Sequence, residues 1–216
     1  MTAVPAKTVM FAIPNKSGVL PAGTVVSIID TMRELKKREW LSVLELHIGN
    51  ALVCNARNQL AAAFLRSGCS DMFCIDDDME WRPKDFIRVL ESPHDFVCGM
   101  YRLKKAELEY NCHPIPESRD GRLLEARKVP VGFARLKRSV LASLVEEGIP
   151  RKSYAEGNEL YKFFYEETID GLDYGEDYLF CQMWRRFGGR IWIDPDCELT
   201  HWGTIGFKST YAETFK

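Results

Sequence analysis

The sequence lacks a long hydrophobic run, a strong excess of one charge and any closely paired cysteine motif. No stretch approaches the roughly 18 apolar residues that a membrane-spanning helix needs, and the first residues, MTAVPAKTVMFAIP, are too weakly apolar for a signal peptide. The formal net charge of −2 argues against tight, nonspecific binding to nucleic acid. The seven cysteines form no CxxC pair, which argues against a disulfide framework or a zinc site. We therefore expect a cytoplasmic protein with no membrane segment.

Hydrophobic residues make up 46% of the 216 positions, which is enough for a sizeable core in a single domain spanning 1–216. The first half alternates between short apolar runs and segments with helical periodicity. These predict strands at 8–13, 41–48 and 72–75, and helices at 24–38 and 55–67. The expected inward face of the first helix carries Val25, Ile28, Ile29, Met32 and Leu35. The alternation favours an α/β fold with a mostly parallel central sheet flanked by helices.

The second half is less regular and predicts a smaller antiparallel part. Apolar runs predict strands at 96–101, 129–136 and 190–193, and helical patterns cover 83–90, 139–147 and 178–187. The polar segment 102–128 predicts a long loop or a hairpin. Basic residues are in excess from Arg102 to Lys152, so this stretch is the best candidate for contact with an anionic partner, although it also fits a solvated loop.

Three consecutive aspartates, Asp76, Asp77 and Asp78, follow the apolar run MFCI. In α/β sheets, ligands bind beyond the carboxyl ends of the strands, where this acidic turn is expected to lie. Carboxylate oxygens are the preferred ligands of Mg²⁺ and Mn²⁺, and a divalent cation would offset the repulsion among the three charges. The alternative is an exposed acidic turn that caps the helix near Pro83.

Two further motifs carry groups with catalytic chemistry. Glu176 and Asp177 open the helix in YGEDYLF, where either carboxylate could act as a general base, although acids also favour the first turn of a helix for electrostatic reasons. His201 follows the last predicted strand in CELTHWG. Its imidazole is either a metal ligand beside the carboxylates or an ordinary packed histidine.

The order of these motifs resembles that of GT-A fold glycosyltransferases. The segments ARNQLAAAFLRSGCSDMFCIDDDMEWRP, GEDYLFCQMWRRFGGRIWID and ELTHWG are similar to the glycosyltransferase family 2-like group, including short members encoded by bacteriophages. The resemblance implies a Rossmann-like GT-A domain with a nucleotide-sugar half at about 1–100 and an acceptor half at about 101–216. For a phage-encoded member, the location would be the host cytoplasm.

The resemblance also implies roles for individual residues. Asp76 and Asp78, with Asp77 between them, would form the DxD motif that binds Mn²⁺ or Mg²⁺ and the nucleotide-sugar diphosphate. His201 would be the late metal ligand. Asp177, in the pair with Glu176, would be the base that activates the acceptor in inverting members.

Further positions would hold the nucleotide sugar. The resemblance places Pro14 and Asn15 beside the base and Arg57 toward the nucleotide. It places the backbone of Gly132 near a sugar, and Lys208 on a segment that folds over the diphosphate.

These features predict a metal-dependent transfer of a sugar from a nucleoside-diphosphate sugar, a UDP-sugar first, to an acceptor hydroxyl with inversion. The acceptor would be a modified pyrimidine in phage DNA, a glycan, a lipid-linked sugar or a protein. For DNA, the basic stretch would follow the phosphates, and Trp81 or Tyr101 would stack on a base. The alternatives are a metal-dependent nucleotidyltransferase or phosphoesterase, and a noncatalytic α/β binding module.

Overall fold

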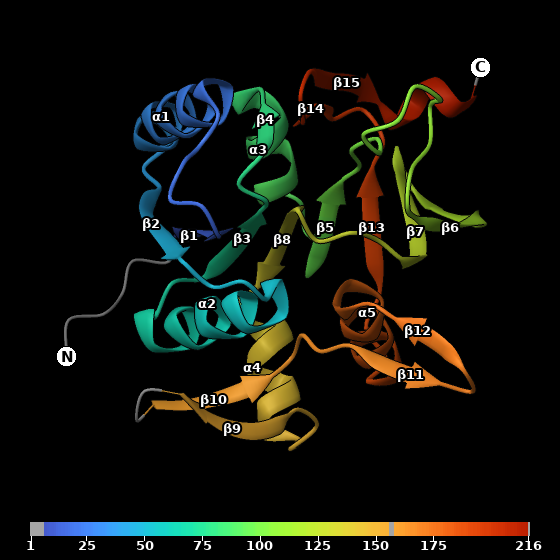
Figure 1. Ribbon diagram of the computed structural model, residues 1–216. Helices are drawn as coiled ribbons and strands as arrows, with labels where there is room; N and C mark the ends of the chain where they lie inside the picture. The colour runs from blue at the N-terminus through green and yellow to red at the C-terminus, as the bar shows by residue number, and fades with distance from the viewer. Residues whose placement is uncertain (1–6, 156–157, 216) are drawn as a thin grey trace.

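The computed structural model describes residues 7–155 and 158–215 and contains an eight-stranded mixed sheet between two layers of helices (Figure 1). The strand order is β2-β1-β3-β8-β5-β13-β7-β6. The strands are β1 (Thr8–Asn15), β2 (Leu41–Ile48), β3 (Asp71–Ile75), β5 (Phe96–Gly99), β6 (His113–Asp120), β7 (Leu123–Lys128), β8 (Phe133–Lys137) and β13 (Ile191–Asp194). The α/β class and most of the predicted strands are confirmed.

The expectation of a mostly parallel sheet is not met. The pairs β1–β2, β1–β3 and β5–β13 are parallel, whereas β3–β8, β5–β8, β7–β13 and β6–β7 are antiparallel. Strand β8 is inserted between β3 and β5 and runs against both. Hydrophobic periodicity reveals a strand but not its direction, so the sequence pattern could not reveal this insertion.

Helices cover both faces of the sheet. Helices α1 (Ala22–Lys37) and α3 (Pro83–Leu90) lie on one face, beside the small sheet of β4 (Met79–Trp81), β14 (Glu198–Trp202) and β15 (Gly206–Thr210) (Figure 1). Helices α2 (Val53–Ser67), α4 (Arg138–Glu146) and α5 (Glu176–Arg186) lie on the other, and a 3₁₀ helix, η1 (Tyr211–Phe215), ends the described chain. Within the described residues, no helix has the length and apolar character to cross a membrane.

Side chains of the central strands alternate between two cores. In β1, Val9, Phe11 and Ile13 face the core beneath α1 and α3, whereas Met10 and Ala12 face the core beneath α2, α4 and α5. Phe86 of α3 stacks on Phe11 and Phe73 with ring centroids 4.8 and 3.9 Å apart. These contacts fix α3 directly behind the strand that leads to the aspartates.

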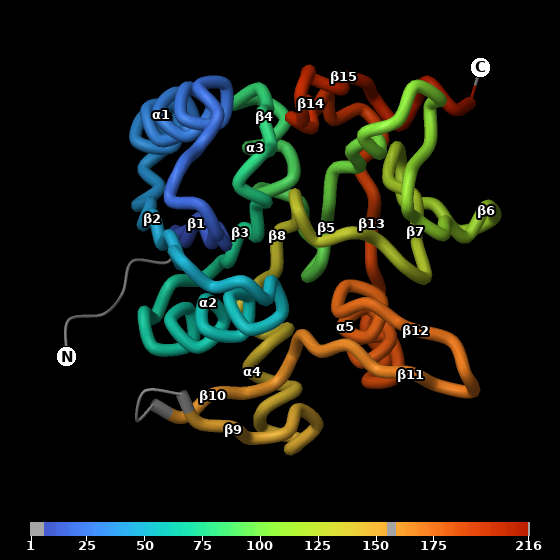
Figure 2. The backbone as a smooth tube through the Cα atoms, viewed as in Figure 1, coloured from blue at the N-terminus to red at the C-terminus, as the bar shows by residue number. Residues whose placement is uncertain are grey.

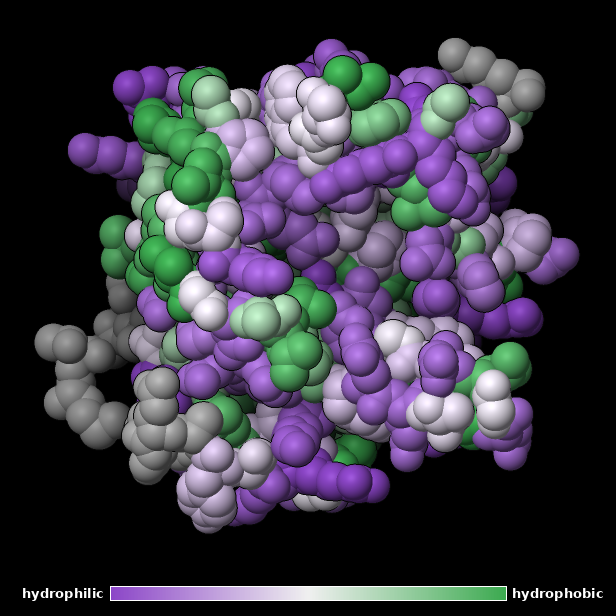
Figure 3. Space-filling view, viewed as in Figure 1, coloured by the Kyte–Doolittle hydropathy of each residue, from purple (hydrophilic) through white to green (hydrophobic). Residues whose placement is uncertain are grey.

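Helix α1 is rotated relative to the predicted inward face. Its buried residues are Thr24, Ser27, Ile28, Thr31 and Leu35, whereas Val25 and Ile29 are exposed. Ser27 and Thr31 turn inward because they bond with Trp81: Ser27 Oγ donates to its carbonyl at 2.9 Å, and its indole donates to Thr31 Oγ1 at 2.8 Å. The displaced apolar residues join those of edge strand β2 in a surface patch (left of Figure 3).

Besides the antiparallel pair β14–β15, the described part of the irregular second half contains three hairpins. The polar segment contains β6 and β7, joined at Gly121. The aromatic and acidic region forms β9 (Arg151–Ala155) with β10 (Asn158–Lys162), and β11 (Glu167–Ile169) with β12 (Leu172–Tyr174). Residues 100–112 form a loop that runs beside β14 and β15 (Figure 2). This loop lies next to the site described below.

Candidate functional site

A cleft of about 390 Å³ lies at the carboxyl ends of β1, β2 and β3. These strands are parallel, so their ends meet at one edge of the sheet, where α/β proteins bind ligands. The cleft brings together residues from both halves of the chain, including most of those singled out from the sequence. Its lining consists of Pro14, Asn15, Lys16, Asn50, Ala51, Val53, Ala56, Arg57, Asp76, Asp77, Asp78, Glu176, Asp177 and His201.

The acidic turn is held in place by the strand beside it. The backbone N–H of Asp76 donates to the carbonyl of Gly132 at 2.9 Å. A Cβ on Gly132 would lie 2.1 Å from Asp76 Oδ2 and 2.3 Å from the Tyr101 hydroxyl. Position 132 therefore needs glycine to make room for the Asp76 carboxylate. Gly132 does not line the cleft itself, so its role in this structure is to support Asp76.

Arg57 is the centre of the cleft floor. Its side chain is 5% exposed and pairs with Asp76 at 2.7 Å, with Glu176 at 2.9 Å and with Asp177. Burial opposes its charge, but these three carboxylates more than compensate and raise the pKa of Arg57 further above its usual range. The family resemblance implied that Arg57 contacts the nucleotide. In the structure, its guanidinium pairs with the three carboxylates instead.

The carboxylate of Asp177 lies between Arg57 and the backbone of Val131. Val131 donates its N–H to Asp177 Oδ2 at 3.2 Å, and Arg57 bonds to Oδ1. The pKa of Asp177 is raised to about 6, mainly by burial. Arg57 lowers this pKa, whereas repulsion from Glu176 and Asp76 raises it further. A carboxylate with a pKa near neutrality is suited to accept a proton in a general-base step.

Asp77 also titrates above the usual carboxyl range. Burial, followed by repulsion from Asp78 and Asp76, raises the pKa of Asp77 to about 6. Thr24 of α1 donates to the backbone carbonyl of Asp77 at 3.4 Å, which ties the turn to that helix. The repulsion expected from the three adjacent charges is therefore present in the folded chain.

Asp78 faces His201 and Lys104. Lys104 Nζ lies 2.5 Å from Asp78 Oδ2, and His201 Nε2 lies 3.5 Å from Oδ1. Burial alone would raise the pKa of Asp78, but the hydrogen bonds and charges of His201 and Lys104 outweigh it and hold the pKa below its ordinary value. Oδ1 is buried, and within the described part of the chain it accepts no hydrogen bond of ordinary geometry, since His201 Nε2 faces it only at 3.5 Å.

The geometry of His201 fixes its neutral tautomer. Its Nδ1 lies 3.0 Å from the carbonyl oxygen of Arg102. Because a carbonyl only accepts hydrogen bonds, Nδ1 carries the proton, and in the neutral ring the lone pair of Nε2 lies toward Asp78. A carboxylate oxygen and an imidazole lone pair that face each other fit a divalent cation of the Mn²⁺ or Mg²⁺ type.

Asp76 does not complete this set of ligands. Both of its carboxylate oxygens are engaged, Oδ1 by Arg57 at 2.7 Å and Oδ2 by the Tyr101 hydroxyl at 3.1 Å. Within residues 7–155 and 158–215, no three His, Cys, Asp or Glu side chains form a ready-made group of metal ligands. The predicted trio of Asp76, Asp78 and His201 is therefore reduced to Asp78 and His201 in this conformation.

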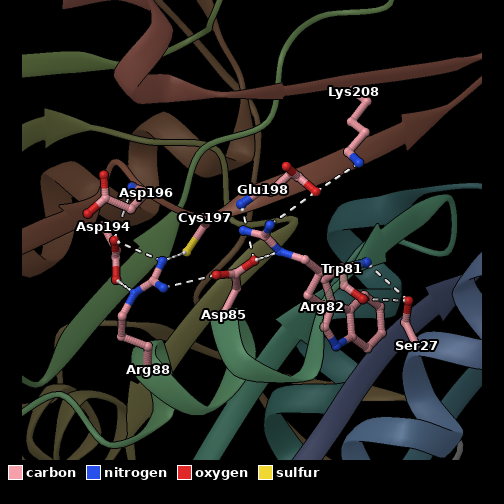
Figure 4. A network of polar contacts seen from close by, with 10 residues as sticks. All are labelled: Ser27, Trp81, Arg82, Asp85, Arg88, Asp194, Asp196, Cys197, Glu198 and Lys208. Atoms are coloured by element: carbon pink, nitrogen blue, oxygen red, sulfur yellow. Dashed lines mark hydrogen bonds and ion pairs between the residues drawn. The ribbon is translucent and has the colours of Figure 1, made fainter.

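Strand β14, which carries His201, is anchored by a separate network of charges that we call the clamp (Figure 4). It consists of Arg82, Asp85, Arg88, Asp194, Glu198 and Lys208. Arg82 links Asp85 to Glu198 of β14 at 2.7 and 3.2 Å. Lys208 pairs with Glu198 at 2.8 Å and does not line the cleft, so the structure does not bring it to the position expected for a diphosphate contact.

The loop after β1 forms the other wall of the cleft. Asn15 is 2% exposed and uses its side chain to organise the turn: Nδ2 donates to the carbonyl of Val19 at 2.9 Å, and Oδ1 accepts from Gly18. Pro14 and the exposed Lys16 line the cleft beside it. Asn15 thus shapes the loop, and Lys16 supplies the positive charge that a phosphate group would meet.

Several of the residues expected to contact DNA, namely Arg135, Trp81 and Tyr101, are buried in the protein. Arg135 is fully buried and donates to the carbonyls of Val89, Ser92 and His94, and Arg138 donates to carbonyls of α2 and Cys69. Trp81 is 4% exposed in the core, and Tyr101, at 6%, is bonded to Asp76. Arg135 therefore serves as an internal hydrogen-bond donor, although most of the other basic residues at 102–152 are exposed. Neither aromatic ring is free to stack on a base.

Sequence reasoning missed three residues of the site, Lys16, Asn50 and Lys104, and gave Tyr101 a different role, stacking on a base. Lys16 could have been found, because it directly follows the Pro14–Asn15 pair. Lys104 and Tyr101 reach the aspartates from the 100–112 loop, 26 and 25 residues along the chain. No local pattern marks such a contact.

Comparisons with known proteins bear on the fold alone. A scan against protein-family profiles finds no match, and a comparison with curated proteins also finds none. Among solved structures, the chain is similar to A197 from STIV, with a TM-score of 0.56 and 21% sequence identity. The similarity covers 91% of this chain and 86% of that one. The two chains thus share an α/β architecture along most of their length.

Proposed function

We propose that this protein is a metal-dependent glycosyltransferase that moves a sugar from a nucleoside-diphosphate sugar to an acceptor hydroxyl. The observation that carries the proposal is the convergence of the acidic turn, Arg57, Glu176–Asp177 and His201 on one cleft, from positions as far apart in the sequence as Arg57 and His201. The sequence singled out these residues for their chemistry and not for their proximity. An acidic turn that merely capped α3 would not need the other groups.

The cleft suits a substrate that brings its own negative charge together with a cation. Five carboxylates, Asp76, Asp77, Asp78, Glu176 and Asp177, surround it, against the cationic Lys16, Arg57 and Lys104. A bound Mn²⁺ or Mg²⁺, held by Asp78 Oδ1 and His201 Nε2, would supply the positive charge that a departing diphosphate requires. Lys16 at the rim and Lys104, once released from Asp78, would meet the phosphates.

Asp177 is the group best placed to accept the acceptor's proton. In the transfer step, the acceptor oxygen bonds to the anomeric carbon, the bond from that carbon to the diphosphate oxygen breaks, and the hydroxyl proton passes to the Asp177 carboxylate. Arg57 and the Val131 N–H hold this carboxylate in a fixed orientation while leaving it further lone pairs. Asp76 accepts from Nη2 of Arg57 and Glu176 accepts from its Nη1, and both contacts help to position the guanidinium.

A thermal-shift panel of UDP, GDP, CDP and TDP, each with and without Mn²⁺, tests the proposal. A ligand that binds only the folded state raises the melting temperature. We expect at least one nucleotide to raise it by about 5 °C or more at roughly a hundred times its Kd, and only when Mn²⁺ is present. If no nucleotide does so, the acidic turn has no diphosphate partner and the proposal fails.

A further inference from the structure

A second cavity, of about 220 Å³, lies between α2 and the hairpin of β9 and β10. Figure 1 shows this hairpin beneath α2, on the side of the helix away from the sheet. The cavity is smaller than the roughly 300–1,000 Å³ of pockets for drug-sized ligands and suits a single ring-sized unit. Its lining consists of Asn50, Asn55, Asn58, Gln59, Ser153, Tyr154, Leu160 and Lys162.

Most side chains that line this cavity are neutral and polar, and suit a neutral polar ligand. Asn55, Gln59 and Ser153 have no hydrogen-bond partner for their side chains within the described residues, and Tyr154 is 71% exposed. An amide offers both donors and an acceptor, and so matches a sugar hydroxyl, which also donates and accepts. An exposed aromatic ring offers a flat apolar face for the C–H side of a sugar.

The rigid wall of the cavity is provided by Asn58. Its Nδ2 donates to the carbonyl of Phe164 at 2.7 Å, and its Oδ1 accepts from the N–H of the same residue at 2.9 Å. This amide is fully used in fixing the chain that follows β10. The bonds of Asn58 thus fix this part of α2, and with it the neighbouring Asn55 and Gln59, which line the cavity.

The cavity and the cleft adjoin. Asn50 lines both, and its Oδ1 accepts from the N–H of Leu52 at 3.1 Å. The first turns of α2 also serve both, since Val53, Ala56 and Arg57 face the cleft whereas Asn55 and Gln59 face the cavity. The cavity and the cleft therefore share Asn50 and the first turns of α2 as a common wall.

We infer that this cavity is the acceptor subsite and that the acceptor is a carbohydrate chain. The inference rests on the proposed function. The cavity holds one unit of the chain, and the next unit presents its hydroxyl to Asp177 in the cleft. A nucleic acid would instead need several cationic side chains for its phosphates. Among the described residues, the lining offers one, Lys162.

The test is binding of the wild-type protein to an array of neutral and acidic oligosaccharides, with single-stranded and duplex DNA as competitors and without nucleotide. We expect at least one oligosaccharide to bind, and Gln59→Ala and Tyr154→Ala each to weaken it about tenfold. The matched control is Asn111→Ala, because Asn111 is an exposed asparagine that lines neither cavity. The variants keep the nucleotide-dependent thermal shift, which shows that they are folded.

Other outcomes overturn one conclusion or the other. Nucleotide binding without oligosaccharide binding, or oligosaccharide binding that Gln59→Ala and Tyr154→Ala leave unchanged, overturns the subsite and leaves the proposed function standing. DNA binding weakened by Gln59→Ala also overturns it in favour of a nucleic-acid acceptor. Oligosaccharide binding without any nucleotide-dependent shift overturns the proposed function, and with it the acceptor role of the cavity.

Discussion

The cleft and the clamp are both networks of arginine and carboxylate groups, but they differ in charge balance. In the clamp, Asp85, Asp194 and Glu198 each pair with at least one arginine, and Asp85 and Asp194 are almost fully buried. In the cleft, carboxylates outnumber cations and Asp177 has a raised pKa. A closed network holds a fold together, whereas an unbalanced one leaves charge for a ligand. Mutations in the cleft should therefore reduce turnover or ligand binding, whereas mutations in the clamp should reduce stability.

The largest effect is expected for Asp177→Asn. The amide keeps the shape of the carboxylate but cannot accept the acceptor's proton, so turnover should fall by about 10²–10⁴-fold. Nucleotide binding measured by thermal shift should change little. Release of nucleoside diphosphate from the donor in the presence of acceptor is the measurement. Unchanged turnover would remove Asp177 from the role of base.

A mutation in the clamp should lower the free energy of unfolding. Asp194 is 1% exposed and bonds to Arg88 at 2.6 Å and to Arg122 at 3.2 Å. Asp194→Ala leaves the partly buried Arg88 without this partner, and the free energy of unfolding should fall by about 3–5 kcal/mol. Urea denaturation measures this loss. A variant as stable as the wild type would mean that the clamp does not hold β14.

The Asp78→Ala variant should lose ligand binding and keep most of its stability. It removes one of the two groups that face each other across the candidate metal site, and metal-dependent nucleotide affinity should fall by at least about tenfold. Its melting temperature without ligand should fall only slightly, because the ion pair of Asp78 with Lys104 is partly exposed and screened by solvent. Titration of the nucleotide with and without Mn²⁺ checks this. Full affinity in the variant would place the metal elsewhere.

The pH dependence of turnover should follow Asp177. With its pKa raised to about 6, the carboxylate is mostly protonated at pH 5 and mostly ionised at pH 7. Since the base acts in its ionised form, turnover should rise by about tenfold between these values and then level off. The Asp177→Asn variant should lose this rise. A profile that is flat from pH 5 to 7 in the wild type would contradict the assignment.

The smallest effect is expected for Lys104→Gln. Lys104 neutralises Asp78 in the absence of a ligand, so its removal should strengthen Mn²⁺ binding about two- to fivefold, because the pair is partly exposed and screened. Lys105→Gln is the matched control, since Lys105 pairs with Glu109 and not with the cleft. Calorimetric titration of Mn²⁺ into both variants checks the difference. Weaker binding in Lys104→Gln would mean that Lys104 supports the cation rather than replacing it.

The comparison also explains what could be predicted from the sequence. Asp76–Asp78, Glu176–Asp177 and His201 were recognisable because strand ends and helix starts place such groups at one edge of an α/β sheet. The direction of β8, the buried face of α1 and the interior position of Arg135 were not. Each of these depends on a partner far along the chain: β3 and β5, Trp81, and the carbonyls around Ser92. Periodicity and local charge contain no information about such partners.

The distance along the chain between Arg57 and its acidic partners has a consequence for how the molecule assembles. Arg57 meets Glu176 across 119 residues, and β8 enters the sheet between strands formed earlier in the sequence. Closing so large a loop is slow, and it must precede the contacts that it allows. The cleft can therefore exist only after the last helix has docked. Nucleotide binding during refolding would report completion of the whole chain, and a nascent chain that ends before α5 would emerge from the ribosome without a site.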